Sequence, residues 1–225
     1  MSTSREIFTL LLNFFYLVIL VFLLIYKKRL GKQIWLFIFA MLTVVITEWV
    51  VYIVRIFNSK FNVNLFYSVG IAVIFFSVML IYFYKILETP RLKKIQLLII
   101  VLNMLNLLAS FHLIEDFFST FSFYNYFVSI ILLLFSVMLF FYETFNSEKI
   151  LQIKSYYPFW ISISLVFIYL GILPLLIMSQ TVGEKLNGNI FGAMLFSINL
   201  IGYSILFIGI FYSKNDFQKK LKFEK

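Results

Sequence analysis

The stretch that decides the fold spans residues 34–57 and reads IWLFIFAMLTVVITEWVVYIVRIF. Apart from Glu48 and Arg55, none of its side chains is charged. An α-helix rises about 1.5 Å per residue, so a helix over this stretch crosses the hydrocarbon core of a bilayer, which is about 30 Å thick. The stretch therefore predicts a transmembrane helix.

The rest of the chain repeats this pattern. Further apolar runs lie at about 7–26, 65–87, 95–114, 123–142, 158–178 and 190–212. Of the 225 residues, 63% are apolar and 13% charged, and the mean hydropathy is +1.00; soluble domains have about 45–50% apolar and about 25% charged residues. We therefore predict an all-α polytopic membrane protein: one seven-helix transmembrane bundle with a short basic tail at 213–225. This excludes a soluble catalytic domain.

The basic residues predict the orientation of the bundle. Of the nineteen Lys and Arg residues, fifteen fall in the loops and the tail on one side of the predicted membrane. Short cytoplasmic loops carry such an excess, so we expect the amino terminus outside and the carboxyl terminus inside. The other side holds Arg5, Arg55, Lys60 and Lys185.

Charge and composition also indicate the surroundings of the protein. The net charge of +9 comes from short basic clusters beside apolar runs, which is typical of topology signals rather than of a nucleic-acid-binding face. The lipid bilayer is thus the expected partner, and nucleic acid is not. Frequent Lys, Phe, Ile and Asn indicate AT-rich coding and a bacterial cytoplasmic (inner) membrane. With no Cys and one His, we expect no metal and no cofactor.

Glu48 is the first candidate for a functional residue. A carboxylate inside a membrane helix costs about 2.5–3.5 kcal/mol and usually faces a protein interior or water. Arg55 lies seven residues further along the same helical stripe, about 10 Å away, and Tyr52 lies between them. The structural alternative is that Arg55 extends to the headgroups and Glu48 is a protonated or hydrogen-bonded packing group.

Asparagine residues extend the candidate site to two other helices. Asn103, Asn106 and Ser110 share one face of the helix at 95–114, because they are three and four residues apart. Asn106 and Asn199 lie at a depth similar to that of Glu48. If their helices are neighbours, they line an outward-facing polar pocket that binds a ligand. Structural bonding between helices is the alternative.

Two other features indicate possible regulation. His112, three residues before Glu115, could respond to pH because a nearby carboxylate moves the titration of an imidazole; interfacial hydrogen bonding is the ordinary alternative. Gly171 and Pro174 interrupt the helix at 158–178, and Pro174 lacks an amide proton. A kink there can act as a hinge or be static.

A family resemblance rests on Pro158-Phe159-Trp160-Ile161, Tyr169-Leu170-Gly171 and Asn64-Leu65-Phe66-Tyr67, together with the Lys-rich tail. With these features the chain resembles a family of small uncharacterised bacterial seven-helix proteins, whose genes often neighbour those of sensor histidine kinases. Its organisation is also similar to the seven-helix sensory regions of bacterial signalling proteins. The resemblance implies a sensory or accessory signalling role, with a sensor histidine kinase or another membrane signalling protein as partner.

Several functions fit these observations. The first is a sensory protein that binds a small or lipidic ligand and acts through a separate partner. The second is a proton- or cation-coupled transporter or channel that uses Glu48 as a relay, and the third is a structural membrane subunit without a ligand. We do not expect an enzyme, because the sequence lacks His-Glu-x-x-His, Gly-x-Ser-x-Gly and phosphate-loop motifs.

Overall fold

The computed structural model describes residues 3–58, 61–113, 117–118, 122–181 and 188–213. Within these residues the chain is all-helical, and seven helical spans are long and apolar enough to cross a membrane, as predicted. The elements are α1 (Thr3–Leu30), α2 (Ile34–Phe57), α3 (Asn64–Tyr67), the π-helical η1 (Ser68–Phe75), α4 (Phe76–Ile86), α5 (Pro90–Leu113), α6 (Phe123–Phe145), the 3₁₀ segment η2 (Glu148–Ser155), α7 (Tyr157–Thr181) and α8 (Gly188–Tyr212). The predicted tail beyond Ser213 lies outside the described residues.

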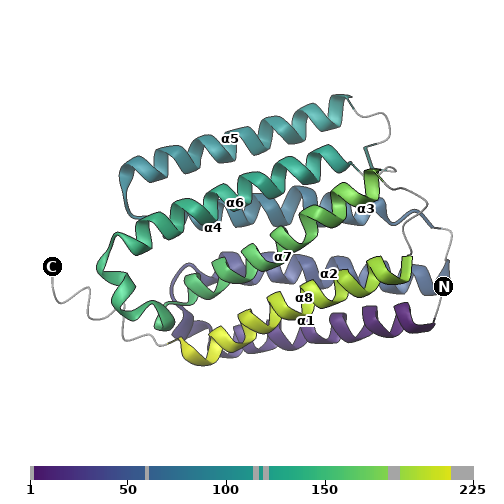
Figure 1. Cartoon of the computed structure of the whole chain (residues 1–225), viewed down its shortest axis with the longest axis horizontal. Helices are drawn as coiled ribbons and strands as arrows, with labels where there is room; N and C mark the ends of the chain where they lie inside the picture. The colour runs from purple at the N-terminus through teal and green to yellow at the C-terminus, as the bar shows by residue number, and fades with distance from the viewer. Residues whose placement is uncertain (1–2, 59–60, 114–116, 119–121, 182–187, 214–225) are drawn as a thin grey trace.

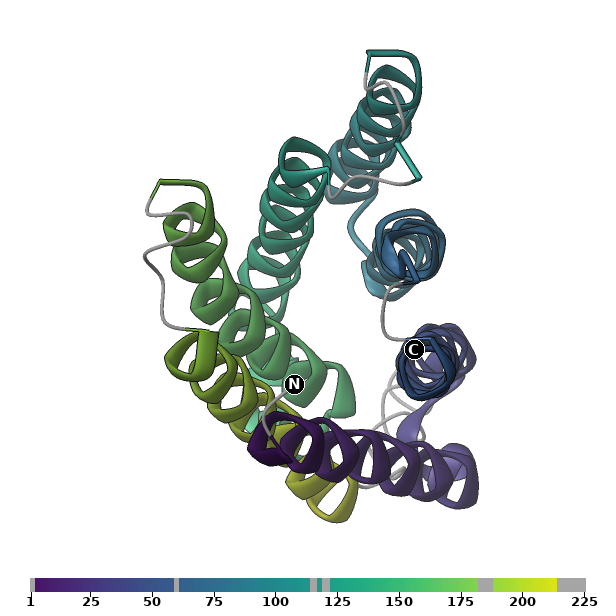
Figure 2. The same cartoon turned by 90° about the vertical axis from the view of Figure 1, so that its right-hand side faces the viewer.

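The long helices run side by side along the long axis of the molecule (Figure 1). Six of the seven spans form a closed ring, in which α1 contacts α2, α2 contacts η1 and α4, α4 contacts α6, α6 contacts α7, α7 contacts α8, and α8 returns to α1 (Figure 2). The seventh, α5, packs outside the ring against α4 and α6. Phe37, Phe76, Tyr82 and Tyr157 are among the large side chains that fill the interior of the bundle.

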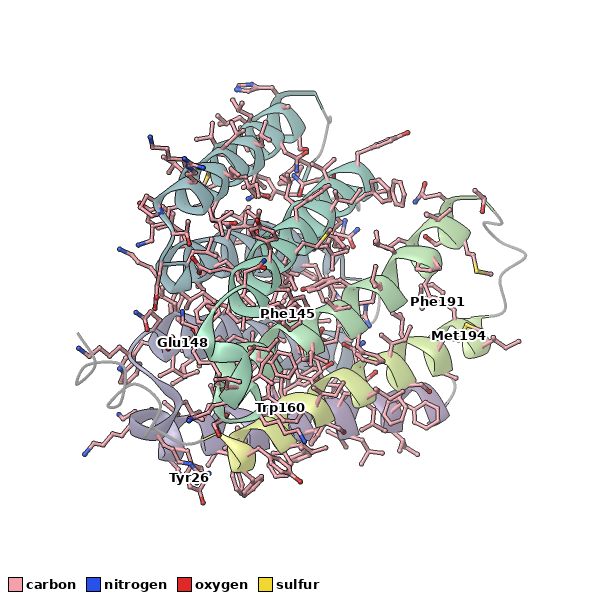
Figure 3. All side chains as sticks on the ribbon, turned by 60° about the vertical axis from the view of Figure 1, so that its left-hand side comes forward. Tyr26, Phe145, Glu148, Trp160, Phe191 and Met194 are labelled. Atoms are coloured by element: carbon pink, nitrogen blue, oxygen red, sulfur yellow. The ribbon has the colours of Figure 1, made fainter. Side chains whose placement is uncertain are left out.

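The two ends of the bundle differ in charge. We call one end the basic end, because the described Lys and Arg residues at and near the connections from α1 to α2, from α4 to α5 and from α6 to α7 lie there, and the opposite end the far end. At the basic end Gly31 turns the chain from α1 into α2 with φ 112°, a left-handed conformation that glycine adopts without steric strain. Figure 3 marks the basic end by Tyr26, Phe145, Glu148 and Trp160.

Several helices extend beyond their predicted bounds. The span predicted at 95–114 begins at Pro90, and the span predicted at 7–26 continues to Leu30. Both additions contain basic residues, which end an apolar run but not a helix. Pro90 suits the first helical position because its missing N–H would have no helical partner there. The apolar pattern therefore locates the hydrocarbon core, not the helix ends.

The third span is not a regular α-helix. Its residues 68–75 form a π-helix, although the sequence predicts one α-helix over 65–87. Gly70 lies in this segment, and a Cβ atom there would approach Thr47 Oγ1 of α2 to 2.0 Å. The π-helical segment and α2 therefore pack with almost no space between them. π-Helical turns are rare and occur frequently at functional sites.

Candidate functional site

The candidate site is built around Glu48 of α2, which is half-buried. Glu48 lies fourteen residues after the start of α2 and nine before its end, so its depth is within the membrane core, nearer the far end. The Tyr67 hydroxyl donates to Glu48 Oε2 at 3.2 Å, and the Tyr126 hydroxyl donates to the backbone carbonyl of Tyr67 at 2.7 Å. Asn13 Nδ2 donates to the backbone carbonyl of Glu48 at 3.4 Å.

Two further tyrosines complete this cluster. Tyr16 of α1 and Tyr203 of α8 are buried, with ring centroids 4.4 Å apart. Both interact electrostatically with the Glu48 carboxylate. We call the group the Glu48 centre; its members are Asn13, Tyr16, Glu48, Tyr67, Tyr126 and Tyr203. Five elements, α1, α2, α3, α6 and α8, contribute side chains to it.

Arg55 lies on the far-end side of the centre. It is half-buried and acts by its charge on Glu48 and Tyr67. No ion pair joins Arg55 to Glu48, although both residues are described, which agrees with the predicted spacing of almost two turns. Tyr52 packs its ring edge-on against Trp49, with centroids 6.1 Å apart. Arg55 therefore places a positive charge on the far-end side of Glu48. Tyr52 packs within its own helix.

The predicted face of Asn103, Asn106 and Ser110 exists, but it does not face Glu48. Asn106 Nδ2 donates to Ser129 Oγ at 3.3 Å and to the Asn125 carbonyl at 3.2 Å, and Ser129 Oγ donates to Asn103 Oδ1 at 3.0 Å. Ser110 is buried on α5 as well. The structure therefore does not bring the polar face of α5 to Glu48, because this helix lies outside the ring and packs on α4 and α6.

Asn199 lies on α8, one helical turn before Tyr203 of the centre. Its Nδ2 donates to the Leu195 carbonyl of its own helix at 2.8 Å. Asn199 is half-buried and contributes a local hydrogen bond rather than a direct contact with Glu48. Matching depth on three helices thus brought none of the asparagines to the carboxylate.

The predicted regulatory residues have ordinary surroundings. His112 is exposed and contacts the ring of Phe111 edge-on at 5.8 Å, while Glu115 lies outside the described residues. A Cβ atom on Gly171 would lie 2.8 Å from Ile198 Cγ2, so this glycine admits close packing of α7 on α8. The α7 helix continues through Pro174 to Thr181. Among the described residues, no group of three or more His, Cys, Asp or Glu side chains could hold a metal ion.

The sequence reasoning missed the tyrosines of the centre. Tyr16 and Tyr203 lie well inside apolar runs, where a phenol needs a hydrogen-bond partner as much as an amide does. This position within the run was the available signal. Tyrosines inside an apolar run need the same attention as Glu48.

A second charged cluster was also missed, at the basic end. The Glu143 carboxylate of α6 accepts the backbone N–H groups of Glu88 (3.0 and 3.1 Å) and Thr89 (2.6 Å), just before α5 begins. Buried Lys149 forms an ion pair with Glu88 at 2.9 Å. Burial, together with the charges of Glu88 and Glu143, raises the pKa of Tyr156 above its usual range. This cluster joins α5, α6 and η2.

No protein-family model, curated protein or solved structure matches this chain.

Proposed function

We propose that the protein is a sensory module of the bacterial cytoplasmic membrane, which binds a small or lipidic ligand at the Glu48 centre and signals through a separate partner. The observation that carries the proposal is that α1, α2, α3, α6 and α8 each place a polar side chain at the Glu48 centre, where Tyr67 donates to the carboxylate and Asn13 and Tyr126 donate to neighbouring backbone carbonyls. A ligand that replaces the Tyr67 hydroxyl at Glu48 changes contacts on several helices at once. A ligand that makes different contacts in two arrangements of the helices shifts the balance between them, and a conformational signal requires such a shift.

The chemistry of the centre favours a ligand with a hydrogen-bond donor or a positive charge. Glu48 offers carboxylate oxygens, and only one side-chain hydroxyl, that of Tyr67, donates to them among the contacts of the described residues. The tyrosine rings add apolar surface and the negative face of an aromatic system, which attracts cations. A primary amine, or a lipid that carries one, has both properties.

The output surface in this proposal is the basic end. The positive excess in its connections favours a cytoplasmic position, with the amino terminus outside. The η2 segment there exposes Leu151 by 82%, beside the buried Lys149 and Glu143. The resemblance described above favours a sensor histidine kinase as the partner that reads a movement of this segment.

The test measures ligand binding and output separately. Purified protein in lipid nanodiscs is screened against primary alkylamines and aminolipids by thermal unfolding, and the Glu48→Gln variant is compared with Glu148→Gln, which changes an exposed carboxylate at the basic end. We expect a ligand that stabilises the native protein and Glu148→Gln but not Glu48→Gln. Crosslinking in native membranes should recover a membrane kinase. A chain that binds no amine and crosslinks only to itself contradicts the proposal.

A proton-coupled transporter is the second candidate, and the Glu48–Tyr67 hydrogen bond favours it because a membrane carboxylate beside a hydroxyl can relay protons. Proteoliposomes with an internal pH dye distinguish the two. Proton uptake that requires Glu48 and an added substrate would support transport, whereas binding without proton movement supports the sensory function.

A further inference from the structure

The interface of α5 and α6 contains a second polar cluster, which is separate from the Glu48 centre. Its members are Asn103 and Asn106 of α5, and Asn125 and Ser129 of α6. Ser129 Oγ connects the two asparagines of α5, and Asn106 Nδ2 also reaches the Asn125 carbonyl. Asn103, Asn125 and Ser129 are each 0% exposed. The cluster is therefore a largely buried polar site within the α5–α6 interface, and Asn106 at its edge is half-buried.

The hydrogen-bonding capacity of this cluster is not filled by the protein. Both Nδ2 and Oδ1 of Asn125 lack a partner, and so does Nδ2 of Asn103. An amide buried without a hydrogen bond costs on the order of 1–3 kcal/mol by mutational measures. At membrane depth, bulk water is not available to relieve this penalty. A molecule from outside the protein that pairs with these atoms would relieve this penalty.

The pattern of missing partners identifies the ligand chemistry. Asn125 lacks both an acceptor for its N–H groups and a donor for its oxygen, and Asn103 lacks an acceptor. A cation could contact only the oxygen, and an anion only the N–H groups. Water can do both, and buried waters typically make about three hydrogen bonds to such groups. We propose that the α5–α6 interface binds one or more ordered water molecules at Asn103 and Asn125.

These waters connect the outer helix to the ring. The α5 helix packs only on one side of the bundle, against α4 and α6, and it exposes large apolar side chains such as Leu98, Leu105 and Leu108 elsewhere. Water-mediated bonds are enthalpically close to direct ones. The waters thus supply part of the attachment of α5, whatever the function of the Glu48 centre.

The experiment detects the water directly. The full chain, labelled with ¹⁵N in Asn and Leu, is reconstituted into vesicles of phosphatidylethanolamine and phosphatidylglycerol, and solid-state NMR follows magnetisation transfer from water protons to nitrogen. We expect the side-chain amides of Asn103 and Asn125 to receive magnetisation severalfold faster than the backbone amide of Leu133, which is 0% exposed and lies further along α6. Transfer as slow as at Leu133 overturns the proposal.

Variants and ions separate the alternatives. In Asn125→Leu, the transfer to Asn103 Nδ2 should fall, whereas the control Asn199→Leu, which removes an amide bonded within its own helix, should leave it unchanged. Replacing Na⁺ by choline should not shift either amide signal, and a shift would assign the site to a cation instead. If Asn125→Leu fails to fold, the comparison of Asn103 and Asn125 with Leu133 in the native chain still tests whether water is bound.

Discussion

At the scale of single residues, the proposed function depends on how Glu48 is stabilised inside the membrane. Its side-chain oxygen takes one hydroxyl donor, Tyr67, and a hydrogen bond contributes about 0.5–1.5 kcal/mol, or about 1.5–3 kcal/mol when its acceptor is charged. We expect Tyr67→Phe to lower the unfolding free energy by about 1–3 kcal/mol, measured by thermal unfolding in lipid nanodiscs. The exposed Tyr212 provides the control, because Tyr212→Phe removes a hydroxyl that the centre does not use. Equal stability of the two variants contradicts the assigned hydrogen bond.

Glu143 is the corresponding residue at the basic end. Its carboxylate accepts the N–H groups that precede α5, where α-helices leave donors without partners. We expect Glu143→Ala to destabilise the protein by about 1 kcal/mol, because partly buried N–H groups lose their charged acceptor, and to accelerate hydrogen exchange at Glu88 and Thr89. Glu143→Gln, which keeps an acceptor oxygen, should lie between Glu143→Ala and the native chain. Unchanged exchange in Glu143→Ala would show that other groups cap α5.

At the scale of elements, the contact between α7 and α8 depends on glycine. A Cβ atom on Gly202 would approach Ile168 Cγ1 to 2.2 Å, and Ser164 Oγ donates to the Gly202 carbonyl at 2.7 Å. We expect Gly202→Leu to destabilise the protein by about 1–3 kcal/mol through overpacking, measured by thermal unfolding. Gly192→Ala on the same helix is the matched control, since nothing lies within 4 Å of its Cβ position. A tolerated Gly202→Leu would imply that α8 shifts freely on α7.

The elements also show what the sequence can and cannot predict. The seven spans followed from apolar run length, because lipid requires about 20 apolar residues per crossing. The start of α5 at Pro90 could not be predicted from run length. The N–H groups just before this helix bind Glu143, which is more than fifty residues away in the chain. The π-helical turn around Gly70 depends on the fit to Thr47 of α2. Run length and periodicity therefore cannot predict features that depend on contacts with another helix.

The candidate site follows the same rule at the scale of the whole molecule. Glu48 was predicted because a carboxylate stands out in an apolar run, and the shared face of Asn103 and Asn106 because helical spacing defines faces. Which helix each face meets depends on the order of helices around the ring. That order placed α5 outside the ring and brought Tyr126 against Tyr67 and Tyr203 against Tyr16 in the Glu48 centre. The depth calculated from helix rise predicts how far along the bundle a residue lies, but it does not predict which residues of other helices surround it.

The orientation of the whole molecule is the remaining prediction, and the absence of cysteine makes it measurable without background. Single-cysteine variants are made at two exposed positions, Asn62→Cys at the far end and Glu148→Cys at the basic end. Because positive charge favours the cytoplasmic side, we expect a membrane-impermeant maleimide added to intact spheroplasts to label Asn62→Cys, and to label Glu148→Cys only after lysis. Labelling of Glu148→Cys in intact spheroplasts would invert the bundle, and with it the assignment of the basic end as the surface that a cytoplasmic partner contacts.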